Sequence, residues 1–150
     1  MLIVGAPVSG RIMSLRDVPD PVFAASMMGP GCVVEPQPGV LTVLAPCSGT
    51  VTKAMPHGCV IAGDGGMSIL VHMGIDTVEL QGRGFTSIAT EGGRIEAGQP
   101  IATWDTGPAL EGGYSLCTPV VAMGVDPADT RVVAGARVEA GDPLFGIAAQ

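Results

Sequence analysis

Two histidines, His57 and His72, are the only histidines in the chain, and they stand fifteen residues apart. An imidazole nitrogen is a good nucleophile near neutral pH, because much of it is unprotonated, and a phosphoimidazole is an equally good phosphoryl donor. Two neighbouring imidazoles could therefore relay a phosphoryl group, with one accepting it and the other assisting. Spacing alone leaves open a second interpretation, in which one imidazole is a buried structural side chain and the other an unrelated surface group.

A metal site is the alternative chemistry for the same region. His57 and Cys59 would share one face of a strand, and His72 with Asp76 would complete a set of four side chains of the types that zinc accepts. Their spacing matches no zinc finger, no H-E-x-x-H motif and no H-x-H element of the lysostaphin-like zinc peptidases. A zinc-binding module or zinc hydrolase is therefore kept as the alternative function, and the main interpretation requires neither a metal nor a cofactor.

The segment around His72 predicts a strand that ends in a turn. Residues 68–73 form a short apolar run closed by a glycine, which is typical of a buried strand. Because side chains alternate along a strand, Leu70 and His72 share one face, while the opposite face carries Ile69, Val71 and Met73. The sequence Gly-Asp-Gly-Gly at residues 63–66 indicates a hairpin that would bring His57 and His72 onto neighbouring strands, where cross-strand side chains can touch.

The composition predicts a domain of β-structure. Of the 150 residues, 47% are hydrophobic but only 3% are aromatic, so the core must be built from aliphatic side chains. The 23 glycines and 13 prolines fall between alternating apolar runs, which indicates turns between short strands. We expect strands at residues 2–5, 8–15, 33–34 and 40–44. Short helical turns are expected at residues 127–131 and, as an alternative to a strand, at residues 21–28.

Two pairs of internal repeats support this interpretation. Residues 6–12, Ala-Pro-Val-Ser-Gly-Arg-Ile, return as Ala-Pro-Cys-Ser-Gly-Thr-Val at residues 45–51, and residues 93–101, Gly-Arg-Ile-Glu-Ala-Gly-Gln-Pro-Ile, return as Ala-Arg-Val-Glu-Ala-Gly-Asp-Pro-Leu at residues 136–144. The second repeat is typical of two strands joined by a glycine turn, with a proline at a position where no backbone N–H is needed for strand pairing. We predict an all-β fold: an antiparallel β-sandwich or barrel with an internal pseudo-repeat and only short helical turns, in a single domain spanning residues 1–150.

The charge pattern excludes several classes of function. The net charge is −7 and the seven basic residues are scattered singly, so there is no basic stripe that could bind nucleic acid. No apolar run approaches the roughly 20 residues of a membrane-spanning helix, and we expect no direct membrane insertion. Four cysteines without a C-x-x-C pair or a signal sequence indicate buried thiols in a cytoplasmic protein.

Together these motifs resemble the glucose-class enzyme IIA of the phosphoenolpyruvate-dependent sugar phosphotransferase system. The most specific match is His-x-Gly-Ile-Asp-Thr-Val-x-Leu at residues 72–80, followed by Gly-x-Gly-Phe at residues 82–85. Further matches, spread over nearly the whole chain, lie at residues 6–10, 17–20, 22–24, 29–31, 45–46, 49–50 and 118–121. The resemblance implies an antiparallel β-sandwich or barrel with an internal pseudo-repeat, in agreement with the duplicated segments.

The resemblance also implies roles for individual residues. His72 would accept a phosphoryl group on its Nε2 from the phosphohistidine of the carrier protein HPr and pass it to a cysteine in the IIB domain of a sugar permease. His57 would assist the onward transfer, and Asp76 would support the site or its turn. An apolar surface around the histidines would bind these partners, and regulatory proteins are further candidate partners. The residues predicted for this surface are Val22, Phe23, Met27, Met28, Leu70 and Val78.

The segment around His57 departs from the family pattern. Family members often carry Thr-x-His-Ala here, whereas this chain has Met55-Pro-His-Gly58 in a segment that looks two residues shorter. The threonine hydroxyl that bonds near the site in those members is therefore missing or supplied from elsewhere.

Overall fold

Short β-strands make up most of the fold, which is seen in a computed structural model that describes residues 1–148. The strands are β1 (Leu2–Gly5), β2 (Gly10–Met13), β3 (Gly31–Glu35), β4 (Val40–Leu44), β5 (Gly49–Met55), β6 (Gly58–Gly63), β7 (Ser68–His72), β8 (Phe85–Ser87), β9 (Arg94–Ile95), β10 (Pro100–Asp105), β11 (Thr118–Met123), β12 (Thr130–Val132), β13 (Arg137–Val138) and β14 (Pro143–Ile147). The helical segments are short: α1 (Pro21–Ala24), α2 (Gly107–Glu111) and the 3-10 turns η1 (Leu15–Asp17), η2 (Thr77–Leu80) and η3 (Pro127–Asp129). No helix within residues 1–148 is long and apolar enough to cross a membrane.

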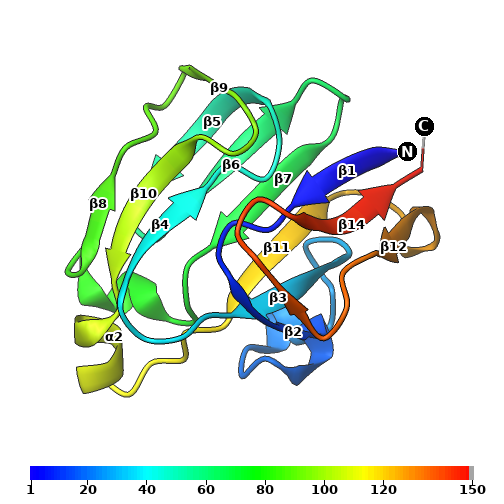
Figure 1. Cartoon of the computed structure of the whole chain (residues 1–150). Coiled ribbons are helices and arrows are strands. Elements are labelled where there is room, and N and C mark those ends of the chain that lie inside the picture. The colour runs from blue at the N-terminus through cyan, green and yellow to red at the C-terminus, as the bar shows by residue number, and fades with distance from the viewer. Residues whose placement is uncertain (149–150) are drawn as a thin grey trace.

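The strands form three antiparallel sheets. The largest has eight strands in the order β13-β2-β3-β11-β7-β6-β5-β9, and the two smaller sheets have the orders β1-β14-β12 and β4-β10-β8. Figure 1 shows the sheet of β4, β8 and β10 on the left and the sheet of β1, β12 and β14 on the right, where β1 pairs with β14. This arrangement confirms the predicted all-β sandwich with only short helical segments.

The predicted strand at residues 8–15 is shorter than expected. Strand β2 covers only residues 10–13, because the side chain of Ser14 accepts a hydrogen bond from the backbone N–H of Arg16 and starts the turn η1. The ambiguous segment 21–28 begins as the helix α1. Asp20 caps this helix, and Pro21 occupies its first position, where a missing N–H costs nothing.

The duplicated sequences occupy equivalent places and contact each other. In one half, the backbone N–H of Ala140 donates to Ser9 Oγ at 2.8 Å, and in the other half Ala97 donates to Ser48 Oγ at the same distance. Strand β13 pairs with β2 as β9 pairs with β5, at the two ends of the eight-stranded sheet. In each half, the serine of the Ala-Pro-x-Ser-Gly repeat therefore accepts a hydrogen bond from the Glu-Ala-Gly repeat. This contact explains why the two motifs are duplicated together.

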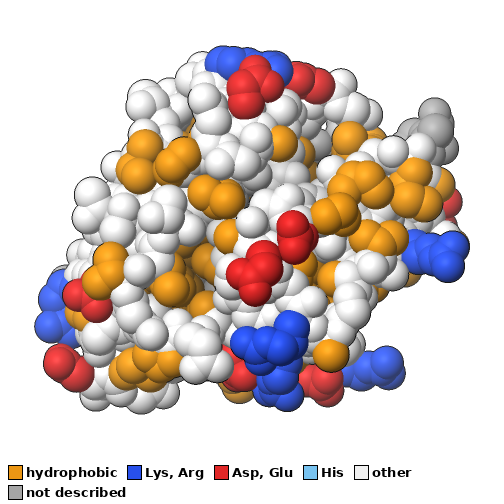
Figure 2. All heavy atoms as spheres, in the orientation of Figure 1, with side chains coloured by type: hydrophobic (Ala, Val, Ile, Leu, Met, Phe, Trp, Pro, Cys, Tyr) orange, Lys and Arg blue, Asp and Glu red, His pale blue; other side chains and the backbone are white. Residues whose placement is uncertain are grey.

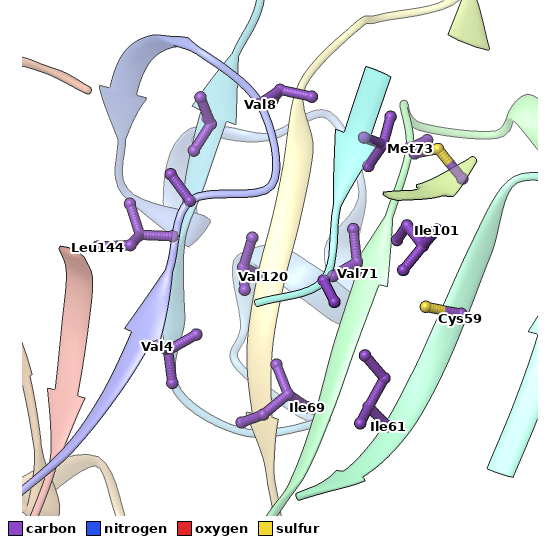
Figure 3. Packing of buried hydrophobic residues seen from close by; sticks show 14 of the residues in the cluster. Val4, Val8, Cys59, Ile61, Ile69, Val71, Met73, Ile101, Val120 and Leu144 are labelled. Atoms are coloured by element: carbon purple, nitrogen blue, oxygen red, sulfur yellow. The ribbon is translucent and has the colours of Figure 1, made fainter. Parts of the chain in front are cut away.

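A pseudo-two-fold axis passes through the middle of the large sheet. Val71 of β7 lies directly opposite Val120 of β11, and both side chains are fully buried. Figure 3 shows this pair between two groups of apolar side chains, one from each half of the duplication. The labelled residues of the two groups are Val4, Val8 and Leu144 on one side and Cys59, Ile61 and Ile101 on the other.

Both faces of the large sheet are buried at its central strand β7. The face of β7 that carries Ile69, Val71 and Met73 belongs to the larger core, which packs against the two small sheets. The opposite face carries Leu70 and is covered by the segment between β2 and β3, through Leu15, Val18 and Phe23. The predicted alternation along residues 68–73 is therefore confirmed, and His72 lies at the border of this smaller core.

The four cysteines are free and buried, as predicted. Burial raises the pKa of Cys32 and of Cys59 to about 12, so both thiols are neutral at physiological pH. They fill apolar space in the larger core, as free cysteines commonly do.

Charged side chains are distributed in small groups over the surface. Figure 2 shows one face of the molecule, where acidic and basic side chains lie in small groups, some of them of both signs, among apolar and neutral ones. One exposed group joins Arg94 to Asp64 and Glu96, with N···O distances of 2.6 and 3.0 Å. Among the described residues on this face, the basic side chains form no extended patch.

The serine contacts of the duplicated motifs predict matched effects on stability. Ser9→Ala and Ser48→Ala should each lower the free energy of unfolding by about 1 kcal/mol, because each leaves one backbone N–H without its hydroxyl acceptor. Urea unfolding of the two single variants and of the double variant would measure this. Since the two serines lie in different halves, the effects should add. A loss confined to one serine would contradict their equivalence.

Candidate functional site

The hairpin of β6 and β7 brings the two histidines together, as the sequence predicted. Gly58 of β6 lies opposite His72 of β7, and His57 occupies the turn just before β6. The two imidazole rings meet edge to face, with 5.0 Å between their centroids and 69° between their planes. The backbone N–H of Met73 donates to the carbonyl oxygen of His57 at 2.7 Å, which ties the turn to the end of β7.

Gly58 allows this close approach. A Cβ atom at this position would lie 2.6 Å from the carbonyl oxygen of Val71, a contact that a side chain could not make without moving the backbone. Gly58 thus pairs with His72 at the end of the β6–β7 ladder without a side chain in contact with Val71.

One hydrogen bond determines which nitrogen of His72 is free. The Nδ1 of His72 lies 2.6 Å from the carbonyl oxygen of Gly74. A carbonyl oxygen only accepts, so Nδ1 must carry the proton and donate. In the neutral imidazole the lone pair then resides on Nε2, which is the nitrogen that can act as nucleophile.

The surroundings of His72 keep its imidazole neutral. Burial lowers the pKa of His72 below its ordinary value, although the carbonyl of Gly74 and the carboxylates of Asp20 and Asp76 act in the opposite direction. The half-buried ring is therefore unprotonated at neutral pH. Its Nδ1–H tautomer is the form in which Nε2 is available to attack phosphorus.

His57 is held mainly by its backbone and by the neighbouring ring. Its side chain is largely shielded, since only 9% of the residue is exposed. Burial lowers the pKa of His57, and the proximity of His72 lowers it further. Among residues 1–148, no side-chain hydroxyl bonds to either nitrogen of His57, so the hydroxyl of the family pattern is not supplied from another position.

Phe23 forms the third side of the site. Its ring meets His72 edge to face, with 5.3 Å between centroids and 61° between planes. Asp20 places this ring, because its carboxylate accepts hydrogen bonds from the backbone N–H groups of Val22 and Phe23 at 2.9 and 3.2 Å. Asp20 was not predicted as a site residue, although an aspartate directly before a proline is a recognisable start signal for a helix.

Asp76 lies four residues after His72, at the start of the turn η2. It is exposed, has a φ of 60° in the left-handed region and precedes η2, and its carboxylate makes no capping hydrogen bond. Its charge acts to raise the pKa of His72, against the larger effect of burial. The support that Asp76 gives to the site or its turn stays a prediction. The next residue, Thr77, is fully buried, and its Oγ1 donates to the carbonyl oxygen of Met73 at 2.6 Å.

The predicted partner surface is exposed only in part. Met27 and Val78 are 73% and 54% exposed, Val22 is also exposed, and Met28 is half-buried. The expectation for Leu70 is wrong: it is only 3% exposed, because the segment between β2 and β3 covers its face of the sheet. Phe23 is likewise mostly buried, with its ring turned towards His72.

The four residues of the zinc alternative do not come together. Cys59 points into the larger core, on the face of the sheet opposite to His72. The expectation that His57 and Cys59 share a strand face is wrong, because His57 lies in the turn and not on the strand. Within residues 1–148, no group of three or more histidine, cysteine, aspartate or glutamate side chains could hold a metal ion.

Comparison with known proteins identifies the family. Residues 2–128 match the family model described as phosphoenolpyruvate-dependent sugar phosphotransferase system, EIIA 1. The chain belongs to this EIIA family. It is therefore a phosphotransferase component of that system, and the resemblance noted in the sequence is confirmed.

Relatives of the EIIA domain include both free proteins and fusions. The chain is 36% identical, over 126 residues, to the glucose-specific EIIA component of Halalkalibacterium halodurans, a match that covers 83% of this chain and 72% of the relative. It is 37% identical, over 146 residues, to the N-acetylglucosamine-specific EIICBA component of Klebsiella pneumoniae. That match covers 95% of this chain but only 22% of the fused relative.

The fold of the EIIA domain agrees closely with a solved structure. Glucose permease IIA from Mycoplasma capricolum superposes with a TM-score of 0.88 at 32% sequence identity. The match covers 96% of this chain and 94% of the solved one.

The lowered pKa of His72 predicts a pH dependence of stability. Between the folded pKa and the ordinary value near 6.5, the unfolded chain binds more protons at this position than the folded EIIA domain does. The free energy of unfolding should therefore fall as the pH drops from about 6.5 towards the folded pKa. Urea unfolding at several pH values would show this slope, and the His72→Gln variant should lose part of it.

A titration of the His72 ring resonances by NMR measures the same pKa directly. The expected midpoint lies below 6.5, because burial disfavours the charged imidazolium. A midpoint above that value would show that the carbonyl of Gly74 and the nearby carboxylates outweigh burial at this ring.

Proposed function

We propose that this EIIA domain is a phosphocarrier that accepts a phosphoryl group on Nε2 of His72 from HPr and donates it to the IIB domain of a sugar permease. The observation that carries the proposal is the hydrogen bond from Nδ1 of His72 to Gly74, because it leaves Nε2 as the free nucleophile. Membership of the EIIA family and the fusion of such domains to IIB and IIC domains in relatives support the same function.

The geometry supports a direct in-line exchange of the phosphoryl group. The lone pair of His72 Nε2 forms a bond to phosphorus while the bond from phosphorus to the donor's imidazole nitrogen breaks, and the donor imidazole takes that electron pair. Throughout, Nδ1 of His72 keeps its proton and its hydrogen bond to Gly74. The phosphorylated ring is thus an imidazolium, and its neutral imidazole is a good leaving group when a cysteine thiolate of IIB attacks phosphorus.

His57 lies where it can assist the onward step. Its ring is 5.0 Å from that of His72, centroid to centroid, and is neutral in the free protein because burial and His72 both lower its pKa. A phosphoryl dianion on His72 would favour protonation of His57 by its negative charge. The protonated ring could then donate a hydrogen bond to a phosphoryl oxygen and stabilise the charge that develops during transfer.

The apolar rim formed by Val22, Met27 and Val78 is the proposed contact surface for HPr and for IIB. These apolar residues are exposed, Val22 next to Phe23 in the chain and Val78 in the turn η2 after His72, and desolvation by a partner would exclude water from the phosphohistidine. Regulatory proteins could use the same rim.

The proposal extends to the setting in which the domain works. The chain spans about a fifth of the fused relatives, so a permease partner is proposed for it and not assigned. We propose a cytoplasmic location, because HPr and the IIB domain must both reach His72. Residues 1–150 would then act as one phosphocarrier unit.

Phosphorylation of His72 gives a direct test. Incubated with phosphoenolpyruvate, enzyme I and HPr, the wild-type protein should gain one acid-labile phosphate, whereas His72→Ala should gain none, because its nucleophile is missing. Mass spectrometry and acid lability of the label would measure this. Labelling of the His72→Ala variant would refute the assignment.

His57→Ala is the matched comparison in the same experiment. It should accept the phosphoryl group, because Nε2 of His72 is intact. Its rate of transfer to IIB should fall at least tenfold; the loss of a positioned acid or base typically lowers a rate by roughly 10²–10⁴-fold. Unimpaired transfer to IIB would show that His57 is structural.

The contact surface can be tested with a methionine and a valine of similar exposure. Met27→Ser should raise the KM for phosphorylated HPr by about tenfold, because it removes apolar area that the complex would bury. Val40→Ser is the control, since Val40 is 70% exposed but lies on β4, away from the histidines. Equal KM values for the two variants would exclude the rim as the contact surface.

A further inference from the structure

The residues that follow His72 form a short link between the two histidines. Met73 donates its backbone N–H to the carbonyl of His57 at 2.7 Å, and Gly74 accepts from Nδ1 of His72 at 2.6 Å. The orientation of the two peptide units on either side of Gly74 therefore decides whether the Gly74 carbonyl can meet the imidazole. Glycine itself does little to fix them, because it is the most conformationally permissive residue.

Two hydrogen bonds anchor these peptide units. On the Gly74 to Ile75 side, the N–H of Ile75 donates to the carbonyl of Ser115 at 3.1 Å. On the Met73 to Gly74 side, the carbonyl of Met73 accepts from Oγ1 of Thr77 at 2.6 Å. The second anchor is the only one of the two made by a side chain, and it comes from a residue with no exposed surface.

The conformation at Gly74 leaves no room for a side chain to take over this task. Its φ is 81°, in the left-handed region, and a Cβ atom there would lie 2.5 Å from Cγ2 of Thr77 and 2.9 Å from the carbonyl oxygen of Ser115. Thr77 thus packs on Gly74 with its methyl group and bonds to Met73 with its hydroxyl. Both contacts act on the same two peptide units.

We propose that Thr77 is the positioning residue for phosphotransfer: its hydroxyl holds the Met73 carbonyl so that the Gly74 carbonyl faces Nδ1 of His72 and keeps Nε2 unprotonated. This role rests on the proposed function of His72 as phosphate carrier. Thr77 does not touch the reacting atoms, so it acts through the tautomer of His72 and not on the phosphoryl group.

The hydroxyl and the methyl group of Thr77 can be separated by substitution. Thr77→Val keeps the methyl contact with Gly74 and removes the hydroxyl, whereas Thr77→Ser keeps the hydroxyl and removes the methyl group. Thr118→Val is the matched control, because Thr118 is also fully buried and also donates to a backbone carbonyl, that of Leu116 at 3.0 Å, but lies on β11.

The experiment measures the tautomer and the rate in parallel. The ¹⁵N shifts of the histidine ring nitrogens at neutral pH distinguish the Nδ1–H form from the Nε2–H form, and single-turnover phosphorylation by phosphorylated HPr gives the rate. Thr77→Val should show a population of the Nε2–H form of His72 and a rate lower by about tenfold at saturating donor. Thr77→Ser and Thr118→Val should keep the wild-type tautomer and rate.

Three results would overturn the proposal: an unchanged tautomer and rate in Thr77→Val, an equal change in Thr77→Ser, or an equal change in Thr118→Val. If Thr77→Val does not fold, a measurement on the wild-type protein still tests the proposal. Its Thr77 hydroxyl proton should exchange slowly with water and should shift as His72 titrates, and a hydroxyl proton insensitive to that titration would also overturn the proposal.

Failure of the proposed function gives a different pattern. The tautomer measurements use unphosphorylated protein and do not depend on any donor. A wild-type protein that is never labelled at His72 would refute the phosphocarrier role, while the comparison of tautomers in Thr77→Val and Thr77→Ser would still test the positioning by Thr77.

Discussion

The hydrogen bond from Nδ1 of His72 to the carbonyl of Gly74 is the interaction on which the chemistry of this domain depends. It selects one tautomer of a neutral imidazole and leaves the lone pair on Nε2. Because the acceptor is a backbone carbonyl and not a carboxylate, the nucleophile is oriented without a fixed charge bonded to the ring. The imidazole that donates this bond lies at the end of β7 and meets the ring of Phe23, and the carbonyl that accepts it belongs to the turn that follows β7.

Burial provides the second condition, which is that the ring stays neutral. Desolvation lowers the pKa of His72 more than the nearby carboxylates of Asp20 and Asp76 raise it. His72 can be half-buried because it lies where the smaller core ends and the cover from Phe23 stops. Val22 and Val78 are exposed nearby, so the proposed nucleophile and its proposed contact surface come from one location in the fold.

The duplication supplies the scaffold, and the site arises where the two halves differ. The axis through Val71 and Val120 relates His57 to Pro30, as shown by matching hydrogen bonds: Met73 donates to the His57 carbonyl at 2.7 Å and Ala122 to the Pro30 carbonyl at 2.8 Å. The place equivalent to His72 is taken by Val121, which is buried in the smaller core. One half of the duplicated fold thus carries the histidines. In the other half, Val121 packs under the segment between β2 and β3 that contains Phe23.

The sequence by itself determined the repeats, the all-β class, the hairpin that joins His57 to His72 and the alternation of side chains along residues 68–73, because these follow from local periodicity and turn residues. Tertiary structure alone decided that Leu70 is covered, that Cys59 faces away from His72 and that Asp20 holds Phe23 in place. It also decided the tautomer of His72. Periodicity predicts which residues share a face, but the cover of that face comes from segments distant in the sequence. The carbonyl that meets the imidazole depends on the backbone angles at Gly74, and a glycine can adopt many such angles.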